Sequence, residues 1–144
     1  MQYPLKNWKR LRRGYRFGEK TFYSPRHLGT DYIVPEGTPV FAPVGCEVFI
    51  AGDFPEGGNT IHIRFKDRKY GPLVMRFMHL LKMSPLGKYK AGEILGLTGN
   101  TGKLTTASHR HQPRQRENRG LQKLPRSRQI FFKICVEYFL SQEK

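Results

Sequence analysis

Residues 60–65 read Thr-Ile-His-Ile-Arg-Phe (TIHIRF), and this alternation of apolar and polar residues predicts a half-buried β-strand. His62 stands between two isoleucines, which favours a polar residue on the outward face over a ligand role. Residues 67–72 turn the chain, and residues 73–80 (LVMRFMHL) predict the next strand. Its parity places His79 on the same face as Met75 and Phe77, where a histidine is either a core residue or a catalytic one.

Further short strands are expected on both sides of this pair, over residues 32–34, 39–42, 45–52 and 93–98. The segments between them are turn-like, and the chain holds 15 glycines and 10 prolines. Hydrophobic residues make up 38% of the sequence and aromatic residues 12%, which is typical of a folded protein. With 144 residues, the sequence predicts one β-rich domain.

The chain carries a formal net charge of +15, concentrated at its two ends. Residues 1–20 hold seven basic residues and one acidic residue, and residues 110–144 hold nine and three. Such a charge favours polyanionic partners, among them nucleic acid, anionic lipid and an acidic cell wall. A basic nucleic-acid-binding module is therefore one alternative, but no helix-turn-helix, RNA-recognition or zinc-finger pattern supports specific recognition of nucleic acid.

Cys46 and Cys135 are the two cysteines, and their spacing predicts free thiols rather than a disulfide framework or a metal site. No apolar run approaches the roughly 20 residues that a membrane-spanning helix needs, so no transmembrane segment is expected. Residues 1–20 are basic without an apolar core, so no signal peptide is expected either.

His109 and His111 are separated by one residue, so on a β-strand both side chains lie on the same face and can share one site. Together with another histidine and a carboxylate, they would provide the ligand types of a catalytic zinc, which has three protein ligands and an open position for water. His27 and Asp31 offer such a pair in the sequence His-Leu-Gly-Thr-Asp. The glycine-rich residues 98–102 invite a phosphate-binding interpretation, but no Lys-Ser/Thr pair or helical pattern follows them.

Five motifs, in order along residues 24–111, resemble the lysostaphin-type zinc endopeptidases, which cut peptide cross-links in bacterial peptidoglycan. The motifs are His27-Leu28-Gly29-Thr30-Asp31, Pro35-Glu36-Gly37-Thr38-Pro39-Val40, Phe77-Met78-His79-Leu80, Gly92-Glu93-Ile94-Leu95-Gly96 with Thr98-Gly99-Asn100-Thr101-Gly102, and His109-x-His111. The resemblance implies a compact, mainly antiparallel β-sheet or sandwich with long loops and a metal in a groove.

The resemblance also implies the roles of the five candidate residues. His27, Asp31 and His111 would bind one Zn²⁺ per chain, and His79 and His109 would be the catalytic histidines beside it. One histidine would orient or deprotonate the water and the other would stabilise the oxyanion or protonate the leaving amine, in an order that the sequence leaves open. The substrate would be a peptidoglycan peptide, the place of action the periplasm or cell wall, and the basic ends could contact anionic wall polymers.

The sequence departs from the family pattern after residue 109. Arg110 and Gln112 stand where apolar residues are expected, and residues 112–128 form a basic, polar segment. Residues 130–140 (IFFKICVEYFL) predict a short helix or strand. We therefore expect a basic extension over residues 1–23, a peptidase domain over 24–112 and an atypical basic tail over 113–144. A change of reading frame after His111 is one explanation of this tail, and a non-catalytic binding or scaffold protein on the same fold is the alternative function.

Overall fold

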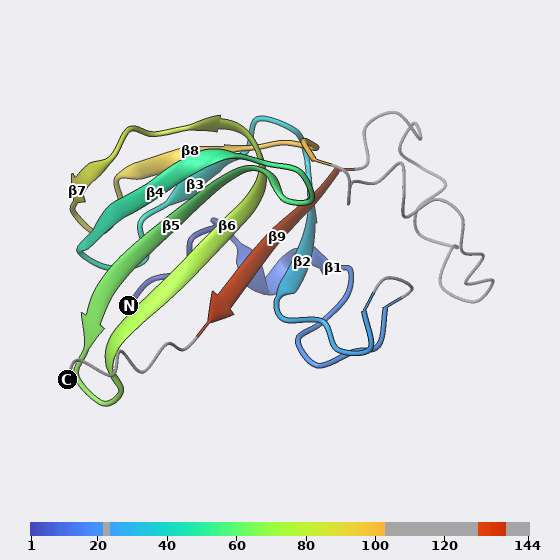
Figure 1. Ribbon diagram of the computed structural model, residues 1–144, viewed down its shortest axis with the longest axis horizontal. Helices are drawn as coiled ribbons and strands as arrows, with labels where there is room; N and C mark the ends of the chain where they lie inside the picture. Colours follow the sequence, from blue (N-terminus) through green and yellow to red (C-terminus); the bar gives the residue numbers. More distant parts are fainter. Residues whose placement is uncertain (22–23, 103–129, 138–144) are drawn as a thin grey trace.

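The computed structural model describes residues 1–21, 24–102 and 130–137, and almost all of its regular structure is β (Figure 1). The elements in these residues are η1 (Trp8–Arg10), a short 3-10 helix, and the strands β1 (Arg12–Arg13), β2 (Thr30–Val34), β3 (Pro39–Phe41), β4 (Cys46–Phe54), β5 (Gly58–Asp67), β6 (Gly71–Met83), β7 (Gly87–Tyr89), β8 (Ile94–Thr98) and β9 (Ile130–Glu137). The strands expected from the sequence are all present, and several extend beyond their expected bounds.

The strands form one sheet in the order β1-β2-β9-β6-β5-β4-β7, and β8 pairs with both β3 and the last part of β6. Figure 1 shows β8 and β3 crossing one end of the main strands. Every pairing is antiparallel. The mainly β, antiparallel fold class expected from the sequence and from the family resemblance is therefore confirmed.

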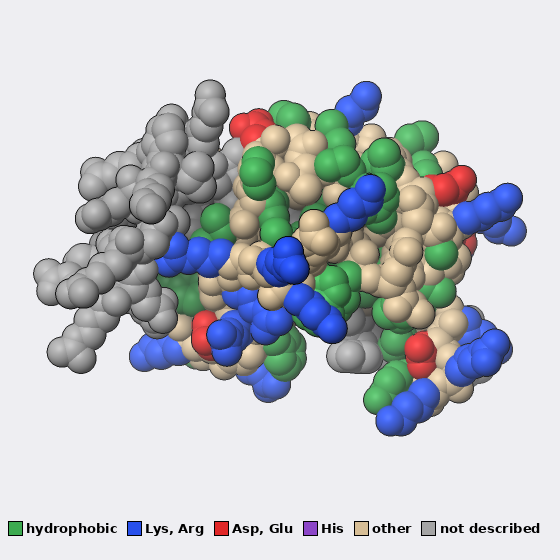
Figure 2. Space-filling model, turned by 180° about the vertical axis from the view of Figure 1, so that it is seen from behind, with side chains coloured by type: hydrophobic (Ala, Val, Ile, Leu, Met, Phe, Trp, Pro, Cys, Tyr) green, Lys and Arg blue, Asp and Glu red, His purple; other side chains and the backbone are tan. Residues whose placement is uncertain are grey.

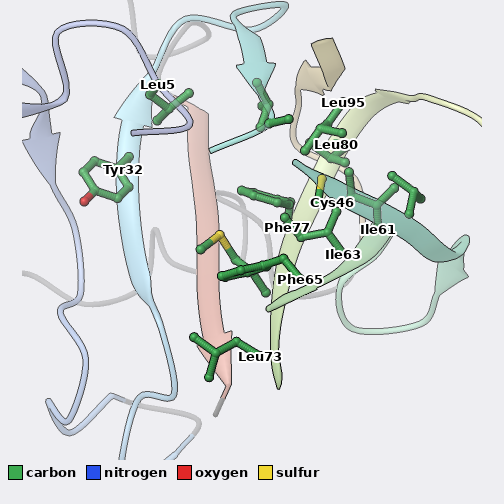
Figure 3. Close-up of a cluster of buried hydrophobic side chains, with 14 of the residues drawn as sticks. Leu5, Tyr32, Cys46, Ile61, Ile63, Phe65, Leu73, Phe77, Leu80 and Leu95 are labelled. Carbon is green, nitrogen blue, oxygen red and sulfur yellow. The ribbon is translucent and has the colours of Figure 1, made fainter. Parts of the chain in front are cut away.

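The alternation in β5 and β6 separates a core face from an outer face. Ile61, Ile63 and Phe65 of β5 point to the core and His62 does not, as the sequence predicts. In β6 the same period buries Met75 and Phe77. Figure 3 shows Ile61, Ile63, Phe65 and Phe77 gathered with buried side chains from other parts of the chain. Burying one large apolar side chain contributes about 1.5–3 kcal/mol, so this cluster is the main source of the sheet's stability.

Residues early and late in the described part of the chain take part in this architecture. Leu5 is 1% exposed within the core cluster, and β1 pairs with β2. Residues 130–137 form a strand, one of the two alternatives that the sequence left open, and β9 lies between β2 and β6. Within the described residues, no helix has the length and apolar character that crossing a membrane requires.

Candidate metal centre

His27 and Asp31 lie at the start of β2, at the end of a loop that backbone hydrogen bonds hold in place. His27 N–H donates to Glu19 O at 2.7 Å, and His27 O accepts from Gly18 N–H at 2.8 Å. Asp31 N–H donates to the carbonyl oxygen of Tyr15 at 2.8 Å. The two side chains are buried, with exposed fractions of 1% for His27 and 2% for Asp31. The loop therefore fixes both residues with little freedom to reorient.

The His27 ring is oriented by a main-chain acceptor. Its Nδ1 lies 3.2 Å from Arg16 O, so in the tautomer with the proton on Nδ1 the ring donates a hydrogen bond there. Nε2 then carries the lone pair, and it lies 3.4 Å from Oδ1 of Asp31. A metal-ligating histidine commonly donates its other ring N–H to such an acceptor, which fixes the tautomer.

The spacing and chemistry of this pair fit two ligands of one zinc ion. Adjacent ligand atoms of a tetrahedral zinc with bonds of about 2.1 Å lie about 3.4 Å apart, the separation of Nε2 and Oδ1 here. Oδ1 of Asp31 is buried and accepts no hydrogen bond from the residues that the structure describes. A buried carboxylate oxygen without a donor is costly, and a bound cation would remove that cost.

The third ligand expected from the sequence, His111, lies outside the described residues, as does His109. Within residues 1–21, 24–102 and 130–137, no three His, Cys, Asp or Glu side chains lie together as a metal site would require. The described structure thus provides two of the three expected ligands and one of the two expected catalytic histidines.

His79 occupies a strained position on β6. Its φ is +62°, a value that side chains other than glycine adopt at a cost of about 1–3 kcal/mol. Its N–H donates to Gly57 O at 2.7 Å, and its Nδ1 lies 2.8 Å from the carbonyl oxygen of Thr101. The side chain is 4% exposed. Strain of this kind persists only where the surroundings hold the residue, and here they hold the His79 ring in one orientation.

Thr101 is a supporting residue that the sequence did not single out. Its hydroxyl donates to Leu80 O and accepts from Asn59 N–H, both at 2.9 Å, so it joins β5 to β6 beside His79. A Cβ at Gly58, whose φ is +61°, would overlap the Thr101 backbone, so this close approach requires glycine. The glycine-rich residues 98–102 therefore support His79. Their sequence, Thr-Gly-Asn-Thr-Gly, was the feature from which this support could have been predicted.

The sheet register places the two parts of the site near each other. Asp31 of β2 and Met78 of β6 both pair with Lys133 of β9. Strands are about 4.8 Å apart, so the Cα atoms of Asp31 and Met78 are about 10 Å apart, and His79 follows Met78 directly. The register therefore brings the backbone of Asp31 and that of His79 to nearby positions on the two sides of β9.

Comparisons with known proteins identify a family and several relatives of this chain. The sequence profile described as Peptidase family M23 matches residues 25–120. The chain is 35% identical over 82 residues to the peptidoglycan DD-endopeptidase ShyA of Vibrio cholerae, a match that covers 55% of this chain and 18% of ShyA. It is 33% identical over 86 residues to the DD-carboxypeptidase/endopeptidase Mpg of Neisseria meningitidis, covering 59% of this chain and 19% of Mpg. The matches thus span about a fifth of these curated relatives.

Among solved structures, the catalytic domain of lysostaphin from Staphylococcus simulans resembles this fold with a TM-score of 0.66 and 24% identity, over 96% of this chain and 90% of that domain. A zinc-containing peptidase from Vibrio cholerae has a TM-score of 0.60 and 21% identity, over 93% of this chain and 36% of that protein. At these identities the similarity establishes the fold.

Proposed function

Because the chain belongs to peptidase family M23, as its resemblance to the lysostaphin-type enzymes predicted, we propose that it is a zinc-dependent endopeptidase that hydrolyses peptide cross-links of bacterial peptidoglycan. The observation that carries the proposal is the buried His27–Asp31 pair, whose Nε2 and Oδ1 atoms are 3.4 Å apart. The names of ShyA and Mpg describe peptidoglycan or DD-peptide cleavage, and a relative from Buchnera aphidicola, 33% identical over 99 residues, is named a metalloprotease.

His27, Asp31 and His111 would hold the zinc, as the sequence predicted, at a site made of two imidazoles and one carboxylate. When bound, the ion would act as a Lewis acid on the peptide carbonyl and lower the pKa of its water to about 7. With two neutral imidazoles and one carboxylate around Zn²⁺, the site would keep a net positive charge. The burial of His27 and Asp31 excludes bulk water from the two ligands on β2 and its loop.

His79 is prepared for proton transfer by its contact with Thr101. The proton on Nδ1 is held by the Thr101 carbonyl oxygen at 2.8 Å, so the lone pair of the neutral ring is on Nε2. In that form Nε2 would accept a proton from the attacking water; in its protonated form the ring would instead stabilise the oxyanion or donate a proton to the leaving amine. His109 would take whichever of these roles His79 does not.

The basic residues would hold the protein to anionic polymers of the wall, and its place of action would be the periplasm or the cell wall. Figure 2 shows one face of the molecule, on which Lys and Arg side chains outnumber those of Asp and Glu. Binding driven by such charges weakens steeply with added salt, so co-sedimentation with purified walls at increasing salt tests this part of the proposal.

A second candidate function, a non-catalytic binding protein on the same fold, is favoured by the position of β9. β2 pairs with β1 on one side and β9 on the other, and residues 74–78 of β6 lie against β5 and β9. A strand containing His109 and His111 would find both of these neighbours already paired. With β9 in this position, His111 would have to reach the site from a segment that pairs neither with β2 nor with residues 74–78 of β6.

Elemental analysis of the purified chain separates the two functions. The enzyme requires about one zinc per chain in the wild type, lost in Asp31→Asn and His111→Ala and retained in the control His62→Ala. Peptidoglycan digestion by the same four proteins should follow the zinc content. Absence of zinc from the wild type would refute the zinc peptidase and leave the binding protein as the function.

A further inference from the structure

The second half of β4 carries exposed apolar side chains on the outer face of the sheet. Beyond Val48, where its pairing with β7 ends, β4 is an edge strand among the strands that the structure describes. Ile50, Gly52 and Phe54 alternate along it and therefore lie on one face. Ile50 pairs with His62, which points away from the core, so this face is the outer one. Ile50 is 36% exposed and Phe54 is 42% exposed. We call these three residues the β4 patch.

The Phe54 ring lies back along its own strand. A Cβ added at Gly52 would be 3.5 Å from Cε2 and 3.8 Å from Cζ of Phe54, which is ordinary van der Waals contact. The ring therefore covers the backbone of Gly52, and the exposed part of the side chain is turned to solvent. An aromatic ring that lies over a strand in this way presents a flat apolar surface to a ligand.

The β4 patch is uncharged, although the chain carries a net charge of +15. His62, whose ring centroid is 6.2 Å from that of Phe54, is neutral near pH 7 because burial, followed by the charge of Arg76, lowers its pKa. Arg64 is bound to the carboxylate of Glu47 at 2.8 Å. The patch thus suits a neutral partner, whereas a second copy of this chain would bring a further charge of +15 and be repelled.

The β4 patch lies on the same face of the sheet as the candidate metal centre. Directly opposed residues of antiparallel strands share a face, and Ile50 is opposite His62, which is opposite Arg76. Met78, two residues after Arg76, is on the face of Arg76. Met78 and Asp31 pair with the same residue of β9, so Asp31 also lies on this face.

The patch is also close to the candidate catalytic histidine. Gly57, three residues after Phe54, accepts the hydrogen bond from His79 N–H at 2.7 Å. Phe54 pairs with Gly58, and the next residue of β5 pairs with Leu80 of β6. Phe54 is therefore two strands across and two residues along from His79, which puts their Cα atoms about 12 Å apart.

We propose that the β4 patch binds a pyranose ring of the peptidoglycan glycan strand, with Phe54 stacked on the apolar face of the sugar. This inference rests on the proposed function, because it takes the His27–Asp31 pair and His79 as the place of cleavage. Peptidoglycan carries its peptides on a strand of acetylated amino sugars, which are neutral rings with apolar C–H faces. The negative face of an aromatic ring attracts such C–H groups.

The position of the patch sets the distance between the sugar and the cleaved bond. An extended peptide advances about 3.4 Å per residue, so about 12 Å corresponds to three or four residues between the sugar at Phe54 and the bond at His79. The partly exposed side chains of Arg64 and Glu47, farther along the same face, would bind hydroxyl groups of the glycan. Phe54 would therefore be a specificity residue and would leave the chemistry of the cleaved bond unchanged.

The first test uses glycan strands freed of their peptides, which the proposed peptidase cannot cleave. Calorimetry with the full, zinc-loaded chain should detect binding, and Phe54→Ala should weaken it by about tenfold or more. Phe54→Trp, which keeps an aromatic face, should retain most of the affinity. Leu86→Ala removes an apolar side chain that is 62% exposed and lies outside the patch, so it is the matched control and should bind like the wild type.

The second test compares cleavage of one cross-linked peptide dimer with and without its sugars. In the wild type the dimer that carries sugars should have the lower KM, by about tenfold, while kcat is similar for the two. Phe54→Ala should make the two KM values nearly equal, with kcat unchanged.

Absence of glycan binding by the wild type, or equal binding by the wild type and Phe54→Ala, would overturn the inference. Self-association that Phe54→Ala abolishes, without glycan binding, would assign the patch to a second copy and also overturn it. If Phe54→Ala does not fold, as judged by circular dichroism, Phe54→Leu takes its place, since it keeps the apolar bulk without the ring. Cleavage of both dimers with equal KM would reject the sugar site and leave the peptidase intact. Glycan binding that depends on Phe54, without cleavage of either dimer, would keep the sugar site and reject the peptidase.

Discussion

Replacing Thr101 by valine should destabilise the protein and displace His79. The substitution keeps the shape of the side chain and removes a hydroxyl that donates to Leu80 O and accepts from Asn59 N–H. Each buried group left without a partner costs about 1–3 kcal/mol, and because water reaches these part-buried groups to some extent we expect a total loss of about 2–4 kcal/mol. For a domain of this size, about 1 kcal/mol lowers Tm by 2–4 °C, so the expected decrease is roughly 5–15 °C.

Urea unfolding followed by circular dichroism measures this loss, and two variants control for side effects. Thr101→Ser keeps the hydroxyl and should retain most of the stability. Thr38→Val removes a hydroxyl whose hydrogen bond to Pro35 O is exposed, so it should cost less than about 1 kcal/mol. The reasoning would be refuted if the free energies of unfolding of Thr101→Val and Thr38→Val differed by less than about 0.5 kcal/mol, because one hydrogen bond contributes about 1 kcal/mol.

Three further predictions concern the same sheet. Gly58→Ala should lower the free energy of unfolding by more than about 2 kcal/mol, because a φ of +61° favours glycine and the new Cβ would overlap the Thr101 backbone. The control Gly45→Ala, whose Cβ would meet nothing within 4 Å, should be near neutral. Thermal unfolding compares the two variants. NMR titration should place the pKa of His62 below its usual value, and Arg76→Gln should raise it. Because the native state resists protonation of this ring, His62 lowers stability as the pH falls below about 6.5, and unfolding of His62→Gln at pH 5 and 7 should show a smaller pH dependence. A His62 pKa unchanged by Arg76→Gln would contradict the electrostatic effect of Arg76 on this ring.

The strands of the central sheet could be predicted because their residues carry the burial pattern themselves. In β5 and β6 the alternation identified both the strands and the outward position of His62, since a strand with one buried face needs apolar residues at every second position. The family resemblance similarly predicted an antiparallel fold, which the register confirms.

Other features depend on contacts between distant residues. The positive φ of His79 is an example, because it is maintained by contacts with residues far away in the sequence. Thr101 bonds to the His79 ring through its carbonyl oxygen and to two strands through its hydroxyl. A local sequence pattern does not predict such contacts. The segment 98–102 was predicted as a loop and as part of a family motif, but its support of His79 could not be predicted, because that support depends on what its backbone touches. The same applies to residues 130–137, whose composition suited a helix as well as a strand.

The sequence by itself predicted the β class and most of the strands, because periodicity is a local property of the chain, and the resemblance of its motifs predicted the family and suggested the candidate residues. Only the tertiary structure decided that β9 pairs with both β2 and β6, that Asp31 and Met78 face one another across it, and that Nε2 of His27 lies 3.4 Å from Oδ1 of Asp31. The physical reason is that strand pairing satisfies backbone donors and acceptors with whichever strand the packed core brings alongside. A local pattern contains no information about that partner.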